Sequence, residues 1–446
     1  MKRQEPATSR LSGMTRRQAT AALLGAASAC IGAAPAFAQR PIELGILGHP
    51  NFAPNSSLKD VADTYKDVWS RFEAENPGVR LRLEPHAGNT EALQEILTKA
   101  SANRLPDVGV MDTFWIPRLH AGNYLQPMDD ILSAADRQDY LPGVLEATTH
   151  GGSLRSIYIY NSWRGLFYRP SAVAKFGYKS PPVDWQDFLK FGAAAKKAGF
   201  PSAIMLPANK SELTMLYLFP QFLGLGGQIH DDNGRPNFFE APNRAKLEQV
   251  LQMWRDLVAQ GLMPAQVGSM DELKTRPFFY SGETATLGSS TSFIKQHYLD
   301  QPQLVGDLNV VPLPMPGGAT PVPLLAAWGY VIFTKDPERQ AVAKKFVRHM
   351  LAPATLGRLN AVQGHLPVRK SIWRDVPAFS QDPIMQSMFK IQSDSRLRER
   401  SIFPIYPAIK DAISEQVAEV IAGQITPARA IDRARDFVMA AYARMR

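Results

Sequence analysis

The sequence predicts an α/β fold that is built on mostly parallel β-sheet and divided into two domains. Near its start, short apolar segments alternate with amphipathic ones in the order strand, helix, strand, helix, strand. Strands joined by helices in this order need right-handed crossovers, which place them parallel in a sheet covered on both faces. The chain has 446 residues. Because a single hydrophobic core stops growing beyond roughly 250–300 residues, a second domain is expected.

The first strand is predicted at 42–47, where the sequence reads IELGIL. Ser56 or Ser57 is expected to cap the helix that follows, because apolar residues recur at three- and four-residue spacing through 58–72. Pro77 and Gly78 then end this helix.

The second and third strands are predicted at 79–84 (VRLRLE) and 107–111 (DVGVM). Asn89 or Thr90 should begin the helix between them, through Leu93, Ile96, Leu97 and Ala100. Since ligands of open α/β sheets bind beyond the carboxyl ends of the strands, three loops are candidates for a binding site. They are His49 to Asn55, Pro85 to Asn89 and Asp112 to Trp115.

Further elements follow in the second half of the chain. Asp184 is expected to cap a helix that begins at Trp185 and ends at Gly199, and the segment 230–236 (HDDNGRP) predicts a plain turn. The remaining elements are a helix through 247–257, two strands within 308–333 around a Pro-Gly-rich connection, a helix at 337–352 and a last helix from Pro427.

The N-terminal segment has the three parts of a cleavable signal peptide. Basic residues including Arg16 and Arg17 precede an apolar run at 19–34, and Ala36-Phe37-Ala38 predicts cleavage after Ala38. The arginine pair resembles the twin-arginine export signal, although the usual Phe-Leu is absent; a general secretory signal is the alternative. Lipidation at Cys30 is a further alternative, but the expected Leu three residues before it is missing.

Composition excludes several classes of function. Residues 1–38 hold five of the 50 Lys and Arg and one of the 41 Asp and Glu, so cleavage would lower the net charge from +9 to +5. This small excess, without a long basic tract, does not indicate a nucleic-acid-binding protein. Because Cys30 is the only cysteine, the mature chain would have no disulfide. No second apolar run approaches membrane-spanning length, so a soluble mature protein is expected.

No catalytic motif is found in the sequence. The eight histidines are scattered, without the His-Glu-x-x-His spacing of zinc hydrolases, and neither a Gly-x-Ser-x-Gly elbow nor a phosphate-binding glycine loop occurs. No cofactor and no metal site are therefore expected. A glycosidase, which needs only two carboxylates in a cleft, stays open at this point.

Aromatic residues are conspicuous in predicted loops. They are Phe52, Phe114, Trp115, Trp163, Phe293, Trp328 and Tyr406. A carbohydrate presents apolar C–H faces and a rim of hydroxyls, so sugar sites pair flat rings with short polar side chains. The alternative for each ring is an ordinary place in the core.

Several segments resemble the extracellular solute-binding proteins of family 1, the receptors of sugar-importing ABC transporters. They include SRFEAENPGVRLRLE, PDVGVMDTFWIPRLHAGNYLQPMDDIL, GLFYRPSAVAKFGYKSPPVDWQDF, FFYSGETATLG and AAWGYVIFTKDPERQAVAKKFVRHML. The resemblance implies a two-lobed periplasmic binding protein fold, in which each lobe is a mostly parallel sheet flanked by helices and the ligand cleft lies between the lobes. It places the N-terminal lobe at 39–162 plus 308–352 and the C-terminal lobe at 163–307 plus 353–446. Crossings near 160–165, 305–309 and 352–356 would form the hinge.

The resemblance also implies a set of ligand-binding residues. They are His49, Asn51, Phe52, Asp112, Trp115, Asn161, Ser162, Trp163, Asn209, Ser290, Thr291, Phe293, Trp328 and Gly329, with Tyr406 added from the loop aromatics. The chain departs from the family pattern at Ala326 and Ala327, where two glycines are usual, which narrows the space beside Trp328.

The function implied is that of a periplasmic, monomeric, non-catalytic sugar or polyol receptor that delivers its ligand to an inner-membrane ABC permease. Alternatives are a receptor for another solute, such as a polyamine or glycerol phosphate, or a secreted carbohydrate-active enzyme. A polyamine needs convergent carboxylates and a phosphate needs convergent arginines or helix amides. Asp112 and Arg164 are the main charges expected at the cleft, which favours a neutral ligand.

Overall fold

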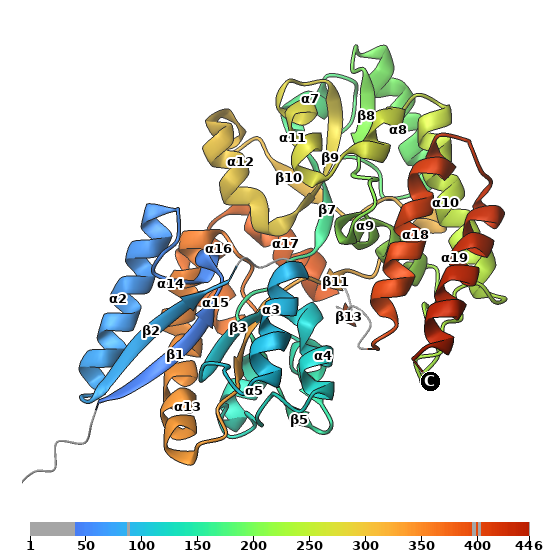
Figure 1. The fold of residues 1–446 in the computed structure, drawn as a ribbon. Helices are drawn as coiled ribbons and strands as arrows, with labels where there is room; N and C mark the ends of the chain where they lie inside the picture. The colour runs from blue at the N-terminus through green and yellow to red at the C-terminus, as the bar shows by residue number, and fades with distance from the viewer. Residues whose placement is uncertain (1–40, 87–89, 395–397, 400–402, 446) are drawn as a thin grey trace, which may run out of the picture. The chain divides into compact units, whose positions relative to one another are not determined.

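A computed structural model describes residues 41–86, 90–394, 398–399 and 403–445 (Figure 1). The predicted signal peptide at 1–38, with Arg16, Arg17 and Ala38, lies outside these residues. None of the described helices has the length and apolar character needed to cross a membrane.

The first large sheet has the strand order β2-β1-β3-β12-β6. Its strands are β1 (Ile42–Gly48), β2 (Val79–Pro85), β3 (Val108–Asp112), β6 (Ile157–Tyr158) and β12 (Trp328–Ile332). β1 and β3 are parallel, whereas β12 runs antiparallel to both β3 and β6. The three predicted N-terminal strands are thus confirmed.

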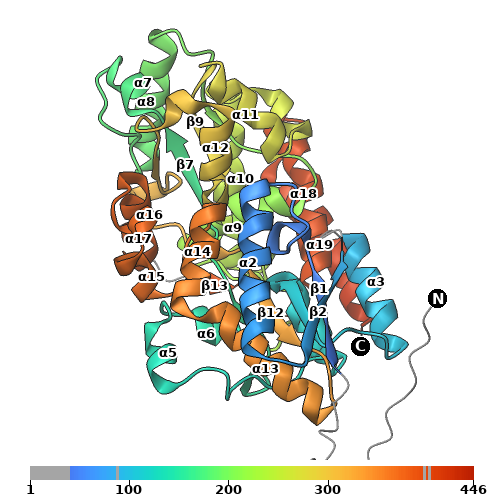
Figure 2. The same cartoon turned by 90° about the vertical axis from the view of Figure 1, so that its left-hand side faces the viewer.

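Helices cover both faces of this sheet because its strands alternate two sets of apolar side chains. Leu44 and Ile46 pack with α2 (Lys59–Glu75) and α13 (Pro337–Leu351). Leu47 faces the other way, into a cluster with α3 (Thr90–Ser101) and α4 (Ile116–Ala121). Figures 1 and 2 show α2 and α13 on the side of the sheet opposite α3.

The second large sheet has the order β10-β7-β9-β8. Its strands are β7 (Arg164–Tyr168), β8 (Ser202–Met205), β9 (Thr284–Ser290) and β10 (Asn309–Val311). Every residue of β9 is buried, since α8 (Trp185–Lys197) packs on the neighbouring β8 and α11 (Glu272–Tyr280) on β9 itself. β8 and β9 are parallel, but β7 is antiparallel to both of its neighbours.

The remaining elements surround these two sheets. Two short pairs are β4 (Thr149–His150) with β5 (Ser153–Leu154) and β11 (Leu324–Leu325) with β13 (Arg398–Glu399). The longer helices are α9 (Glu212–Gly224), α10 (Asn243–Ala259), α14 (Pro353–Gln363), α17 (Pro383–Asp394), α18 (Tyr406–Ile421) and α19 (Pro427–Ala443), and the shorter ones are α5 (Ala134–Asp139), α6 (Val144–Ala147), α7 (Pro170–Ala174), α12 (Ile294–Asp300), α15 (Lys370–Asp375) and α16 (Pro377–Ser380). α10, α18 and α19 pack together.

One expectation about the fold needs correction. The sheets are mixed rather than mostly parallel, because β12 and β10 join them from distant segments and not through strand-helix-strand units. β10 pairs with β7 in the second large sheet, whereas β12 lies in the first, and α14 packs against α2. The lobe bounds and the hinge crossings stay predictions.

Helix starts show how far local rules reach. Asp184 caps α8 as predicted, accepting hydrogen bonds from the backbone N–H groups of Gln186 at 2.9 Å and Asp187 at 3.2 Å. α2 instead begins at Lys59 without a side-chain cap, because the Ser56 hydroxyl accepts from the N–H of Leu58 within the preceding loop. At 230–236 Asp231 closes the predicted turn by accepting from the N–H of Asn233.

Candidate functional site

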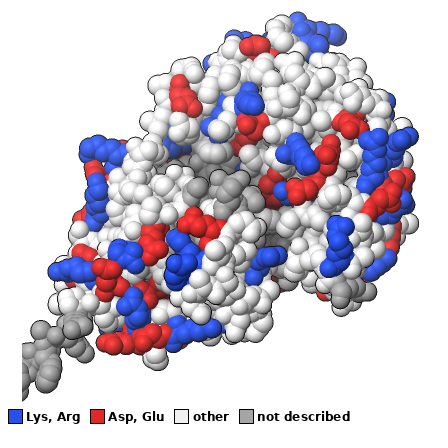
Figure 3. Space-filling model, viewed as in Figure 1, with Lys and Arg blue, Asp and Glu red and all other residues white. Residues whose placement is uncertain are grey.

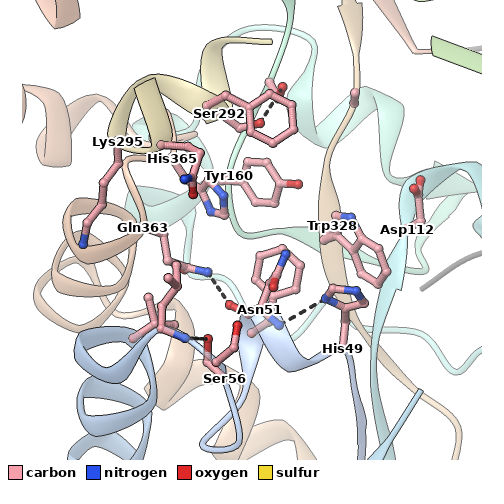
Figure 4. A pocket seen from close by; sticks show the side chains of 18 of the residues that line it. His49, Asn51, Ser56, Asp112, Tyr160, Ser292, Lys295, Trp328, Gln363 and His365 are labelled. Atoms are coloured by element: carbon pink, nitrogen blue, oxygen red, sulfur yellow. Dashed lines mark hydrogen bonds between the residues drawn. The ribbon is translucent and has the colours of Figure 1, made fainter. Parts of the chain in front are cut away.

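A pocket of about 540 Å³ is lined by segments of both large sheets and by helices α2, α9, α12 and α14. Its wall residues are His49, Asn51, Phe52, Ser56, Ser57, Leu58, Val61, Asp112, Tyr160, Ser162, Arg164, Glu212, Leu213, Leu216, Ser292, Phe293, Lys295, Gln296, Leu299, Ala326, Trp328, Gln363 and His365. Polar and aromatic side chains thus share this wall (Figure 4). On the molecular face drawn in Figure 3, basic and acidic side chains are interspersed, without a large area of one sign.

Trp328 is the centre of an aromatic wall. It begins β12 and pairs across the ladder with Asp112, the last residue of β3, so both side chains lie where their strands meet the pocket. The ring centroids of His49 and Phe52 are 5.0 Å and 5.3 Å from that of Trp328. His49 is held in this place by the turn after β1, where its Nδ1 accepts a hydrogen bond from the N–H of Asn51 at 3.1 Å.

A second stacked pair extends this wall. Tyr160 and His365 lie with their rings 4.1 Å apart and nearly parallel, and Phe52 stacks on Tyr160 at 5.6 Å. Tyr160 precedes β7 and His365 follows α14, so the wall joins three distant parts of the sequence. Flat rings in contact present an apolar surface of the kind that the C–H face of a sugar covers.

Burial keeps two of the nearby imidazoles uncharged at neutral pH. His86 is 5% exposed and its ring stacks on Trp328 at 5.7 Å. Burial lowers the pKa of His86 to about 4, despite the hydrogen bond between its Nε2 and the carbonyl oxygen of Val110. Burial likewise lowers the pKa of His365 to about 3. The aromatic wall is therefore neutral on this side.

Three serine hydroxyls lie together on the side of the second sheet. The Oγ of Ser162 is 2.6 Å from that of Ser290, which is in turn 2.8 Å from that of Ser292. Arg164 pairs with Ser290 across β7 and β9, so the turn after β9 is brought against the chain that enters β7. Ser162 and Ser292 border the pocket and can exchange hydrogen bonds with a ligand hydroxyl.

Carboxylates and cations complete the wall. Asp112 accepts a hydrogen bond from the N–H of Phe114 at 2.9 Å, and Glu212 accepts one from the Tyr406 hydroxyl at 3.2 Å. The Arg164 guanidinium lies 3.4 Å from the buried carboxylate of Glu272. Figure 4 places Asp112 and Lys295 at opposite sides of the pocket.

The sequence pattern of bacterial extracellular solute-binding proteins matches residues 55–355. This match spans most of the chain, including helices α2 and α3 and the strand β12, which begins at Trp328. The chain belongs to this family. It is a solute-binding protein of an ABC transporter and not an enzyme.

Relatives and solved structures agree with this assignment. The "Probable ABC transporter-binding protein" of Deinococcus radiodurans is 23% identical over 334 residues, which cover 73% of this chain and 77% of that protein. The sn-glycerol-3-phosphate-binding periplasmic protein UgpB of Shigella dysenteriae is 24% identical, covering 82% and 86%. The structure of the sugar-binding protein MalE from Xanthomonas citri superposes with a TM-score of 0.76 at 22% identity, covering 91% and 98%. The solute-binding protein thus has the fold of MalE.

The structure brings seven of the predicted ligand-binding residues to the pocket wall. They are His49, Asn51, Phe52, Asp112, Ser162, Phe293 and Trp328. Two of the loops predicted from strand ends thereby contribute, the loop after β1 and the loop after β3. The loop at 85–89 is described only to His86, which supports Trp328 from behind.

The other predicted residues of the solute-binding protein do not border the pocket, and their role in binding stays a prediction. Four of them are close to residues of the wall. Trp115 packs edge-on against Trp328 at 5.5 Å, and the Ser290 hydroxyl lies between those of Ser162 and Ser292. The Thr291 hydroxyl accepts a hydrogen bond from the N–H of Trp163 at 3.1 Å, and the Tyr406 hydroxyl donates one to Glu212.

The remaining four residues are Asn161, Trp163, Asn209 and Gly329. Asn161 and Trp163 are buried in the chain that enters β7, and Asn209 accepts a hydrogen bond from the Ser211 hydroxyl at 2.7 Å. Gly329 is needed for packing, because a Cβ there would lie 2.7 Å from the Ser156 hydroxyl oxygen.

Sequence reasoning missed several wall residues. Tyr160, Glu212, Lys295, Gln363 and His365 were not among the predicted ligand-binding residues. An aromatic residue directly before Asn161 was a usable signal for Tyr160. The sequence around Gln363, the last residue of α14, and around His365 does not indicate a binding site. The two residues reach the pocket only because α14 packs on α2.

Proposed function

We propose that this solute-binding protein captures a sugar or polyol in the Trp328 pocket and delivers it to the inner-membrane permease of an ABC importer. The observation that carries the proposal is the aromatic wall of His49, Phe52 and Trp328 facing a pocket that is also lined by serine hydroxyls and carboxylates. Rings cover the apolar C–H face of a sugar, while carboxylates accept hydrogen bonds from its hydroxyls.

The relatives support a carbohydrate-like ligand. MalE from Xanthomonas citri is named as sugar-binding and UgpB as binding sn-glycerol 3-phosphate, a phosphorylated polyol. A polyamine is less well matched, because its ammonium groups would need several carboxylates, and here the pocket wall holds the cations Arg164 and Lys295 as well as Asp112 and Glu212.

We further propose that two lobes close over the ligand. β6 and β7 belong to different sheets, so the chain between Ile159 and Trp163 is one crossing, and the segment between β10 and β12 is a second. Closure transmits binding to the permease only if the ligand binds the closed state more tightly than the open one. We also propose that the protein is a monomer in the periplasm. It would be exported by a signal peptide that is cleaved after Ala38, with Arg16 and Arg17 as a twin-arginine signal.

A thermal-shift screen tests the ligand class. Purified protein is mixed with mono- and disaccharides, polyols, polyamines and inorganic anions in turn. A ligand present at about a hundred times its Kd should stabilise the fold by roughly 2.7 kcal/mol. Stabilisation by carbohydrates or polyols is expected; stabilisation by polyamines alone would refute the proposal.

Trp328→Ala tests the site itself. Losing the stacking ring should weaken binding of the ligand roughly 10- to 100-fold, the equivalent of one buried aromatic side chain. The matched control is Phe437→Ala, which removes a ring that is 53% exposed in α19 and does not line the pocket. Isothermal titration should give wild-type affinity for the control. Equal affinity in the Trp328 variant would show that Trp328 is only a core residue.

A further inference from the structure

On the side of the second sheet, two arginines and one glutamate are buried at or near the pocket wall. Arg164, at the start of β7, borders the pocket, and its side chain is only 7% exposed. Its partner Glu272, in α11, is 1% exposed. Arg276 follows Glu272 one helical turn later and is itself 5% exposed. Two buried guanidinium groups thus stand against one buried carboxylate on this side of the pocket, and only Arg164 is paired with it.

Glu272 is already engaged by other donors. One carboxylate oxygen accepts a hydrogen bond from the N–H of Ser290 at 2.7 Å and lies 3.4 Å from the Ser289 hydroxyl. The other oxygen is 3.4 Å from Nη2 of Arg164, a long contact for an ion pair. The Nε of Arg164 is buried and has no hydrogen-bond partner.

Arg276 has no ion pair with any residue that the structure describes. Its Nε and Nη2 are buried without hydrogen-bond partners, and its guanidinium lies 3.9 Å from the ring centroid of Phe293. Phe293 borders the pocket, whereas Arg276 does not. His297, whose pKa is lowered to about 3 by burial and by Arg276, is neutral and cannot offset this charge.

The other carboxylates of the wall, Asp112 and Glu212, form no ion pair with Arg164 or Arg276 among the described residues. Asp112 lies beside Trp328 in the first sheet, and Glu212 accepts a hydrogen bond from Tyr406. Lys295, at the side of the pocket opposite Asp112, donates to the carbonyl oxygen of Val362 and adds a further cation. A buried charge without a partner is costly, and an anionic ligand group beside Arg164 would reduce that cost.

We propose that the ligand is a carbohydrate or polyol that carries one anionic group, a carboxylate or a phosphate, and that this group binds against Arg164, Ser292 and Phe293. The hydroxyls of the same ligand then lie towards Trp328, where Asp112 accepts their hydrogen bonds. The inference rests on the proposed function, since it names the chemical class of the ligand in the same pocket.

Matched pairs of neutral and acidic ligands test this proposal on the wild-type protein. Calorimetric titrations compare glucose, galactose and mannose with their uronates and 6-phosphates, maltose with maltobionate, and glycerol with glycerol 3-phosphate. At least one acid should bind about tenfold or more tightly than its neutral parent, the usual gain from a charge-assisted hydrogen bond. Comparing the uronates with the phosphates identifies the anionic group.

Substitutions then locate the group. Arg164→Gln should weaken binding of the acid about tenfold or more beyond any loss for its neutral parent, and Arg164→Lys should lose less than Arg164→Gln. Arg169→Gln is the matched control, because Arg169 follows the other end of β7, pairs with Asp307 and does not line the pocket. Circular dichroism checks that each variant is folded.

The outcomes separate the two proposals. If a neutral sugar or polyol binds and no acid binds more tightly than its neutral parent, the anionic class is wrong and the sugar or polyol receptor stands. If no carbohydrate or polyol of either kind binds, both proposals fail. If an acid binds more tightly but Arg164→Gln and Arg169→Gln affect it equally, the anionic group does not lie at Arg164.

Discussion

Acidification should destabilise the solute-binding protein through His86, the imidazole behind Trp328. The pKa of this group falls from 6.5 to about 4 on folding because the ring is buried. Between these two values the unfolded chain binds more protons than the folded one, so stability is fully present above pH 6.5 and is lost as the pH falls towards 4. A difference of about 2.5 pH units corresponds to roughly 3 kcal/mol at about 1.36 kcal/mol per unit.

Urea denaturation at pH 7.0 and pH 4.5 measures this contribution. The wild type should lose about 2–3 kcal/mol more than His86→Gln between the two pH values, because glutamine can occupy a similar volume but does not titrate in this range. Other buried histidines act equally in both proteins and cancel in the comparison. Equal losses in the two proteins would refute the reasoning, since they would mean that His86 is not held neutral by the fold.

Two further predictions concern the first sheet. Asp107→Ala should lower the free energy of unfolding by about 1–3 kcal/mol, because it leaves the N–H of Gly45 without its acceptor at 2.8 Å and the half-exposed Arg339 without its carboxylate, 2.7 Å from Nε. Urea denaturation measures the loss, and an unchanged free energy of unfolding would contradict the prediction. Gly109→Ala should cost about 1–3 kcal/mol, since its Cβ would lie 2.6 Å from the Phe333 ring; an unchanged midpoint of thermal unfolding would show that the ring moves aside freely.

Local rules predicted the N-terminal elements well, because each depends on a few neighbouring residues. The apolar spacing of α2 and the capping carboxylate of Asp184 are visible in the sequence, and so is the alternation of apolar and charged residues in β2. The direction of β12 was not predictable in this way. β12 pairs with β3 and β6 because the chain passes from β10 in the second sheet back to the first sheet. The residues of β12 carry no information about this path.

The candidate site was predictable where it follows strand ends. His49 and Asp112 could be located from the pattern alone, since ligand loops of α/β sheets follow parallel strands. His365 and Arg276 could not, because their importance comes from packing: the first lies on Tyr160, and the second is buried behind Phe293 without a carboxylate. Whether a buried arginine has a carboxylate partner can be seen only when the contacts in the structure are known.

The most direct test of the central claim is a crystal structure with the ligand found in the screen. The proposal predicts electron density for one ligand between Trp328 and Ser292, with a sugar or polyol face on the Trp328 ring. A ligand in another cavity, such as the one lined by Arg169, Lys175 and Phe200, with the Trp328 pocket left to solvent, would contradict the account.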